Sequence, residues 1–260
     1  MAVVTARLIM PIRFGSGHRQ REREPVKLLR TILVPLFLSF GTLPAQADEV
    51  WLELMLAIDV SGSIVQKEYD LQIKGIAAAF RAEPVIEAIA ETGARGIAVS
   101  VMMWSGVGEH RVLVDWTHVR TRPEIEQLAT TIETIDRPFA GNTALGAMIR
   151  TAIPLFADNG FEGNRRIIDV SGDGVRNEGP ETKLMRDEAV AAGITLNGVP
   201  IGETDLDVFD YYRDHVIGGP GSFVMNARGF QEFPDVFRAK LEREIRGPVV
   251  ATAPSHRRKG

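Results

Sequence analysis

Short apolar segments alternate along the chain with segments in which apolar residues recur every three or four positions. The short segments are rich in Val, Ile, Leu and Met and contain few polar residues, which is typical of strands buried on both faces. We predict strands at residues 51–58, 97–104, 166–170 and 194–199, a hairpin-like strand at 111–115 and a short last strand at 223–225.

The intervening segments have the spacing of amphipathic helices. Tyr69, Ile73 and Phe80, for example, fall on one apolar stripe when the segment is helical. Gly193 follows one such segment directly and is a typical helix stop. We predict helices at residues 69–80, 123–135, 145–156, 181–192, 205–215 and 230–245.

Strands that alternate with helices, and that are apolar on both faces, predict a mostly parallel sheet covered by helices on both sides. The predicted fold class is therefore α/β, with a Rossmann-like, doubly wound sheet. Ligands of such proteins bind beyond the carboxyl ends of the strands. We therefore expect the functional residues in the loops that follow the strands.

The first 47 residues have a different pattern from the rest. Lys27 and Arg30 precede an apolar stretch at 32–43, and the small residues Ala45 and Ala47 follow it. This order predicts a secretory signal cleaved after Ala47, with an uncleaved anchor as the less favoured alternative. Residues before Val26 fit neither a signal nor a fold, so the true translation start is expected near Val26. The domain is predicted at 48–246 and a flexible basic tail at 247–260.

Composition and charge narrow the classes of partner. The chain is 45% hydrophobic and 25% charged, an ordinary globular composition. It has 30 Lys and Arg against 34 Asp and Glu, and the predicted leader holds seven of these bases and two of these acids. The mature part therefore carries a formal charge of −9, which disfavours nucleic acid and anionic membranes as partners. No run of eighteen apolar residues occurs beyond residue 50, so stable membrane insertion is not expected after removal of the signal. With no cysteine, the chain has neither disulfides nor a thiolate metal site.

Candidate chemistry begins where the first strand ends. Asp59, Ser61 and Ser63 place three oxygen side chains on alternate residues of one loop, before the first helix. Oxygen ligands without sulfur or imidazole suit a hard divalent cation, Mg²⁺ first, with Mn²⁺ and Ca²⁺ as alternatives. Helix capping is the competing interpretation, but it accounts for one of these residues and not for all three.

Two further strand-end loops carry oxygen side chains. Thr143 precedes a predicted helix, where an N-cap role is the simpler interpretation on its own. Asp173 follows the strand at 166–170 between two glycines, a composition that is also typical of a plain turn. Together with the first loop, these residues would place oxygen groups from three loops at one edge of the sheet.

These three elements resemble the metal-ion-dependent adhesion site (MIDAS) of von Willebrand factor type A (VWA) domains, and the resemblance extends over roughly residues 50–245. It implies that Ser61 and Ser63 coordinate the metal directly and that Thr143 does so in the ligand-bound state. Asp59 and Asp173 would act mainly through bound waters. Such a metal is incompletely neutralised and attracts a Glu or Asp from a partner protein.

A narrower similarity to an exported bacterial subgroup of unknown function rests on residues 169–174, 216–223 and 240–245. That similarity supports the same fold but does not indicate which substrate or partner the protein has. Asn142 departs from the family, because many relatives have Gly or Ser before the threonine.

The predicted function is that of an exported, periplasmic or secreted, metal-dependent protein-binding module without enzymatic activity. A Mg²⁺-dependent hydrolase is the first alternative, but an aspartyl-phosphate mechanism needs a carboxylate where this chain has Ser61. An accessory role in an envelope assembly complex is the second.

Other polar and aromatic residues are expected to be structural. Asp169 lies inside a predicted buried strand and is expected either to brace the metal loops or to occupy a sheet edge. Trp104 and Trp116 are expected in the core. The remaining candidates, expected at the surface or in the core without metal-binding roles, are His110, His118, His215, Asp205, Asp207 and Asp210.

Overall fold

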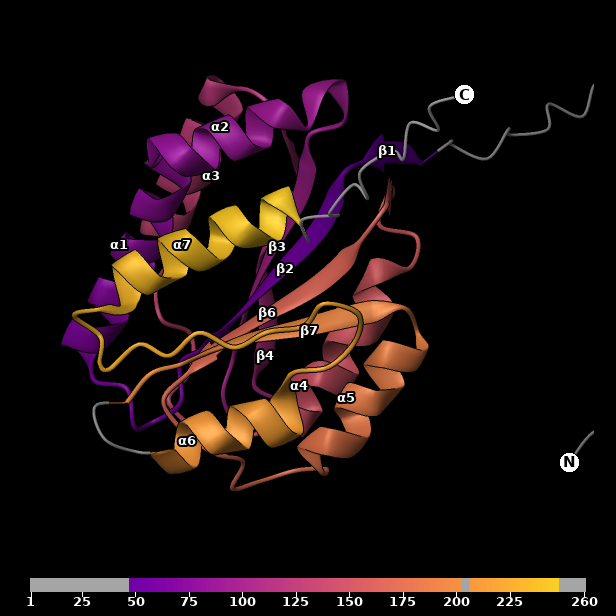
Figure 1. Ribbon diagram of the computed structural model, residues 1–260. Coiled ribbons are helices and arrows are strands. Elements are labelled where there is room, and N and C mark those ends of the chain that lie inside the picture. The colour runs from indigo at the N-terminus through magenta and orange to yellow at the C-terminus, as the bar shows by residue number, and fades with distance from the viewer. Residues whose placement is uncertain (1–46, 203–205, 248–260) are drawn as a thin grey trace, which may run out of the picture. The chain divides into compact units, whose positions relative to one another are not determined.

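The computed structural model describes residues 47–202 and 206–247, so residues 1–46 of the predicted leader and the tail beyond 247 lie outside the described residues. The centre is a five-stranded sheet in the order β4-β3-β2-β6-β7, in which only the edge strand β4 is antiparallel (Figure 1). The strands are β2 Leu52–Asp59, β3 Ile97–Trp104, β4 His110–Val119, β6 Arg166–Gly172 and β7 Ile194–Pro200, and β1 Asp48–Val50 pairs with β5 Phe161–Gly163 in a separate two-stranded sheet.

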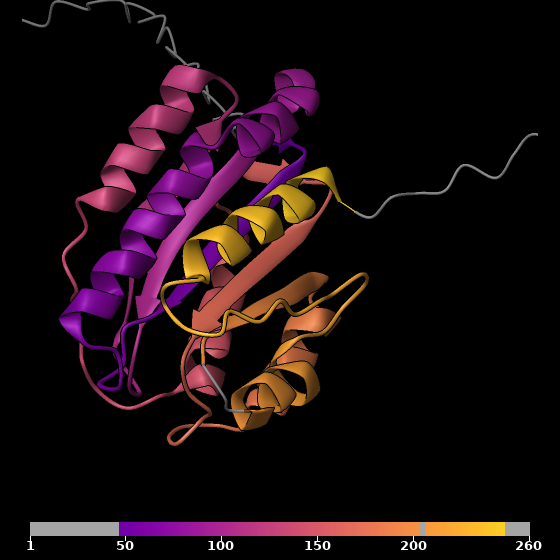
Figure 2. The same cartoon turned by 60° about the vertical axis from the view of Figure 1, so that its left-hand side comes forward.

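Helices cover both faces of the sheet, as the sequence predicts for a doubly wound α/β fold (Figure 2). One face is covered by α1 Gln66–Arg81, α2 Glu83–Glu91, α3 Arg122–Glu133 and α7 Phe233–Arg246. The other is covered by α4 Leu145–Ala152, α5 Thr182–Ala191 and α6 Leu206–Tyr211. Short helical turns complete the chain, namely the 3₁₀ turns Gly93–Arg95 and Ile153–Phe156 and the π-helical turn Tyr212–Val216.

The side chains of β2 explain why this strand is central. Leu54 and Leu56 point to the α1 and α7 side, whereas Met55 and Ala57 point to the α4 and α5 side. All eight residues of β2 are buried, so the strand fills both cores with its alternating side chains. Its carboxyl end is thereby fixed in the middle of the sheet edge where ligands are expected.

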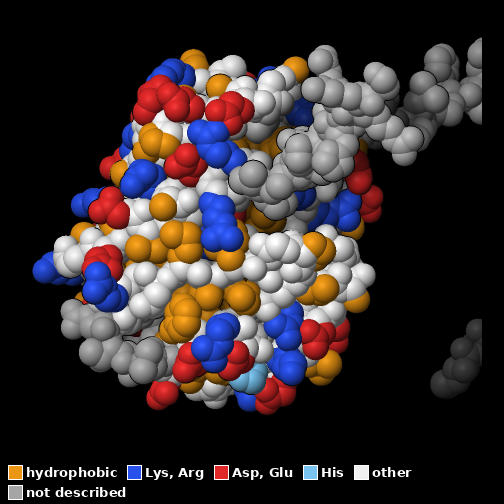
Figure 3. Space-filling model, in the orientation of Figure 1, with side chains coloured by type: hydrophobic (Ala, Val, Ile, Leu, Met, Phe, Trp, Pro, Cys, Tyr) orange, Lys and Arg blue, Asp and Glu red, His pale blue; other side chains and the backbone are white. Residues whose placement is uncertain are grey.

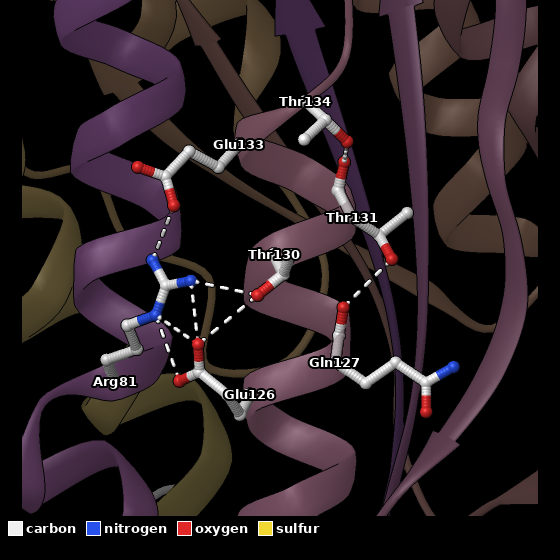
Figure 4. A network of polar contacts seen from close by, with 7 residues as sticks. All are labelled: Arg81, Glu126, Gln127, Thr130, Thr131, Glu133 and Thr134. Carbon is white, nitrogen blue, oxygen red and sulfur yellow. Dashed lines mark hydrogen bonds and ion pairs between the residues drawn. The ribbon is translucent and has the colours of Figure 1, made fainter.

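Exposed polar contacts connect two helices on the first face. Arg81 at the end of α1 donates to Glu126, Thr130 and Glu133 of α3 (Figure 4). Because these side chains are partly or largely exposed to solvent, we expect the network to contribute little to stability.

Three details differ from the sequence-based prediction. The predicted strand at 223–225 is wrong, because that segment forms a single isolated bridge, between Val224 and Gly198 of β7. Gly219 and Gly221, just before it, have positive φ, which is not extended backbone. The helix predicted at 145–156 becomes a 3₁₀ turn at Ile153, where Pro154 cannot donate a backbone hydrogen bond. Helix α2 was not predicted; it follows α1 after Ala82 alone.

The structure shows the burial of several residues that were expected in the core or at the surface. Trp104 is fully buried, and Trp116 is partly buried against Phe156 at 5.0 Å between ring centroids. Asp207 is exposed and Asp210 pairs with Arg213, whereas Asp205 lies outside the described residues. Within the part of the chain that the structure describes, every helix is too short or too polar to traverse a lipid bilayer.

A buried charge network joins the sheet to the last helix. Lys240 on α7 is fully buried, and its Nζ lies 2.5 Å from both Asp169 Oδ1 of β6 and Glu244 Oε1. Asn197 of β7 donates to the same Glu244 oxygen at 2.7 Å. Burial and the nearby Asp169 charge raise the pKa of Glu244, since one ammonium faces two carboxylates. Asp169 therefore connects β6 to α7. The expectation that it lies at a sheet edge is wrong, because β6 is flanked by β2 and β7, whereas its bracing of the metal loops stays a prediction.

Replacing Lys240 tests this network. We expect Lys240→Met to lower the free energy of unfolding by about 3–5 kcal/mol, because two carboxylates would lose their buried counterion. Urea unfolding at neutral pH measures the difference, and Lys74→Met on the exposed surface of α1 is the matched control. Equal stability of the two variants would show that the buried pairs do not hold α7.

Candidate metal site

The loop after β2 is folded around the first aspartate. Asp59 is fully buried, and its Oδ1 accepts the backbone N–H of Ser61 at 2.7 Å. The N–H of Gly62 donates to the carbonyl of Gly141 at 2.8 Å. This second bond joins the loop after β2 directly to the loop that carries Thr143.

Side-chain contacts bring the first loop to the loop after β6. The Ser61 and Ser63 hydroxyl oxygens lie 3.2 Å apart, and the Ser63 hydroxyl donates to Asp173 Oδ1 at 2.7 Å. Ser61 is buried, Ser63 is exposed, and Asp173 lies between these extremes. Four of the five predicted residues are thus connected by a chain of hydrogen bonds that begins in the interior at Asp59 and ends at the surface.

Thr143 lies against the same loop without joining that chain. Its backbone N–H donates to Asn177 Oδ1 at 2.8 Å, and the Asn177 N–H donates back to the Thr143 carbonyl at 3.1 Å. A Cβ added to Gly174 would lie 3.5 Å from the Thr143 hydroxyl oxygen. The threonine hydroxyl therefore lies next to the residue that follows Asp173, although it bonds to none of the other four side chains.

The buried Asp59 and the partly buried Asp173 dominate the electrostatics of the site. Burial raises the pKa of Asp59 to about 7, against the lowering effect of its bonds to Ser61, and burial also raises the pKa of Asp173. Asp59 Oδ2 has no hydrogen-bond partner among the described residues. Arg137 provides a nearby positive charge, but its guanidinium donates to the carbonyls of Val60 and Ser61. The site consequently favours a cation.

Tyr212 was not identified from the sequence as part of the site, and the glycines around Asp173 were interpreted as those of a plain turn. Tyr212, in the π-helical turn, is fully buried, and its hydroxyl has no partner in the described part of the chain. A Cβ at Gly172 would lie 2.6 Å from Asp59 Oδ2 and 2.8 Å from the Tyr212 hydroxyl. Gly172 and Gly174 both lack a positive φ, so the glycine at 172 serves close packing rather than a sharp turn. No local motif distinguishes Tyr212 in the sequence.

Ser105, at the end of β3, was also missed. Its hydroxyl accepts the N–H of Gly141 at 2.6 Å and donates to the carbonyl of Asn142 at 3.2 Å. Its own carbonyl accepts the N–H of Ala144 at 2.9 Å. A third strand end therefore positions the Thr143 loop, a role that its place directly after a predicted strand could have indicated.

The donor set fits a hard divalent cation. Hydroxyl and carboxylate oxygens from three loops meet at one sheet edge, and the unpartnered Asp59 oxygen is a buried acceptor of the kind such an ion favours. In residues 47–202 and 206–247, no group of three or more His, Asp or Glu side chains could hold a metal ion. A cation at this edge would therefore depend on the serine and threonine hydroxyls.

The fold is that of a VWA domain. Proximal thread matrix protein 1 of the mussel byssus matches with a TM-score of 0.58 at 15% identity, over 75% of this chain and 48% of that one. A von Willebrand factor type A protein from Catenulispora acidiphila matches at 0.51 and 17% identity, over 76% and 43%. The pilus adhesin SpaC of Lactobacillus rhamnosus GG matches at 0.53 and 13% identity, over 77% and 31%. The chain thus spans about half the length of the mussel protein.

Residues 49–249 match a family described as "Protein of unknown function (DUF1194)", and the chain belongs to that family. No curated protein sequence matches it. The predicted VWA-like domain is confirmed by these comparisons, while the five ligand residues remain a prediction.

The close packing at Gly172 can be tested by substitution. We expect Gly172→Ala to destabilise the protein by about 1–3 kcal/mol, because its methyl group would displace the Asp59 carboxylate or the Tyr212 hydroxyl. Gly174→Ala is the matched control, since its methyl group would meet only ordinary contacts with Thr143. Urea unfolding of both variants measures the difference. A Gly172→Ala protein as stable as the control would contradict the packing described here.

Proposed function

We propose that the protein is a metal-dependent protein-binding module. In this proposal Ser61, Ser63 and Thr143 coordinate a divalent cation directly, while Asp59 and Asp173 hold it through water. The proposal rests above all on one observation: one buried and one partly buried carboxylate, both with raised pKa values, adjoin serine hydroxyls at the sheet edge. A cation there would offset the cost of burying both charges.

The donor chemistry suggests how a partner would be bound. A cation held mainly by neutral hydroxyls keeps much of its charge and supplies Lewis acidity toward a further oxygen ligand. Ser63, which links Ser61 to Asp173 in the hydrogen-bond chain, is exposed, so this side of the site faces incoming molecules. An Asp or Glu side chain of a partner protein is the ligand that we propose for this position.

Hard oxygen ligands favour Mg²⁺, with Mn²⁺ and Ca²⁺ as alternatives. One structure of the mussel byssus protein is described as having a zinc-occupied MIDAS motif, which supports a divalent metal in general. SpaC is described as a pilus adhesin, which supports a binding role for a domain of this fold.

The proposed location is the periplasm or the extracellular space. It rests on the predicted signal in residues 1–47 and on the acidic mature composition, which disfavours nucleic acid. We propose no catalytic role, because Ser61 occupies the position where an aspartyl-phosphate enzyme needs an acid/base carboxylate.

Alanine variants at the candidate ligands test metal binding. We expect Ser61→Ala and Asp173→Ala to lower Mg²⁺ affinity by about 10–100-fold, as loss of a metal-supporting group typically does. Isothermal titration calorimetry gives the affinities, and far-ultraviolet circular dichroism checks that the fold is retained. Asp115→Ala, at an exposed position of β4, is the control and should bind Mg²⁺ normally.

Partner binding is tested by capturing envelope proteins on the immobilised full-length protein with Mg²⁺ and then with EDTA. Proteins retained through the site should elute with EDTA and should not be retained by Asp173→Ala. Retention that neither EDTA nor the variant alters would reject the proposed function.

A further inference from the structure

A groove is lined by Asp173, by the first turns of α1 and by the segment at 228–232. Its volume is about 450 Å³, within the range of ligand-binding pockets. Val65, Leu71 and Phe230 supply apolar surface, and Phe230 comes from the segment before α7. Asp173 therefore belongs both to the candidate metal site and to the lining of this groove.

Apolar exposure is concentrated beside the candidate metal ligands. Four large hydrophobic side chains are exposed in the described residues, and three of them, Val65, Val107 and Val175, lie on the loops after β2, β3 and β6. Val65, at the mouth of the groove, is 57% exposed. Figure 3 shows further hydrophobic side chains gathered between α7 and α6, where the segment at 217–232 crosses this face. Clustered apolar exposure of this kind marks interaction surfaces.

Charged side chains of both signs line the groove. Lys67 is exposed and forms no ion pair within the described residues. Arg228 pairs with Glu232 at 3.2 Å, yet its side chain remains 74% exposed. Both cations line the groove together with the carboxylates of Glu68, Asp173 and Glu232, so its surroundings carry charges of both signs.

We propose that this groove binds an apolar side chain that neighbours the acidic residue of a partner polypeptide. The inference rests on the proposed function, in which the acidic residue is held at Ser61, Ser63 and Thr143. A lipid would meet Glu68 and Glu232 in the lining, and a nucleic acid would meet the same carboxylates and Asp173. Apolar side chains interspersed with charges of both signs suit a polypeptide segment instead.

Peptide binding to the full-length protein tests the proposal. The probes are two synthetic eight-residue peptides, each with one central Glu, flanked in the first by Leu and in the second by Ser. With Mg²⁺ present, we expect the Leu peptide to bind about 10-fold more tightly, because only its side chains can bury apolar surface in the groove. Biolayer interferometry of the immobilised peptides measures both affinities.

Two substitutions of equal exposure localise the effect. Val65→Ser should reduce the preference for the Leu peptide at least about threefold, since it removes apolar surface at the groove mouth and serine is accepted before a helix. Leu184→Ser, on α5 over the opposite face and likewise 57% exposed, should leave the preference unchanged. Calorimetry should give the same Mg²⁺ affinity for both variants.

The outcomes separate the groove from the metal site. Equal binding of the two peptides that is lost in EDTA overturns the groove and supports the proposed function. A preference for the Leu peptide that persists in EDTA but falls in Val65→Ser supports the groove and rejects the metal role. Absence of binding by either peptide under all conditions overturns both.

Discussion

Burial of the Asp59 carboxylate is the constraint on which the rest of the site depends. Strand β2 is central and buried along its whole length, so its last side chain cannot reach bulk water. Only one of the two carboxylate oxygens is hydrogen-bonded in the described residues, and the pKa rises to about 7. Burial favours the neutral, protonated form of this carboxyl group, whereas a cation beside it would favour the charged carboxylate.

The order of the strands brings residues from several loops next to the buried Asp59. Because β2 lies between β3 and β6, the loops that follow these three strands open at one edge. Ser105 after β3 fixes the Thr143 loop, and Asp173 after β6 receives the hydrogen bond of Ser63. Gly172 leaves the space that Asp59 and Tyr212 share. The site is therefore a property of the sheet order rather than of any single motif.

The sequence was sufficient to predict those features that repeat regularly along the chain. Strand β3 was predicted at its observed bounds, because a dense apolar run with clear ends admits few alternatives. The convergence of Asp59, Ser61, Ser63 and Asp173 followed from the rule for strand ends in α/β sheets. Tyr212 could not be predicted, since its place beside Asp59 depends on packing between segments about 150 residues apart. The pairing of Asp169 with Lys240 could not be predicted either, because it also depends on packing between segments far apart in the sequence.

That pairing has a consequence for the order in which the domain can fold. Asp169 belongs to β6, next to the central strand, but its counterion arrives only with the final helix of the domain. A nascent chain that ends before residue 240 would have to accommodate an uncompensated charge within its sheet. We therefore expect cooperative folding to become favourable only after α7 has been synthesised, because α7 supplies the charge that β6 lacks.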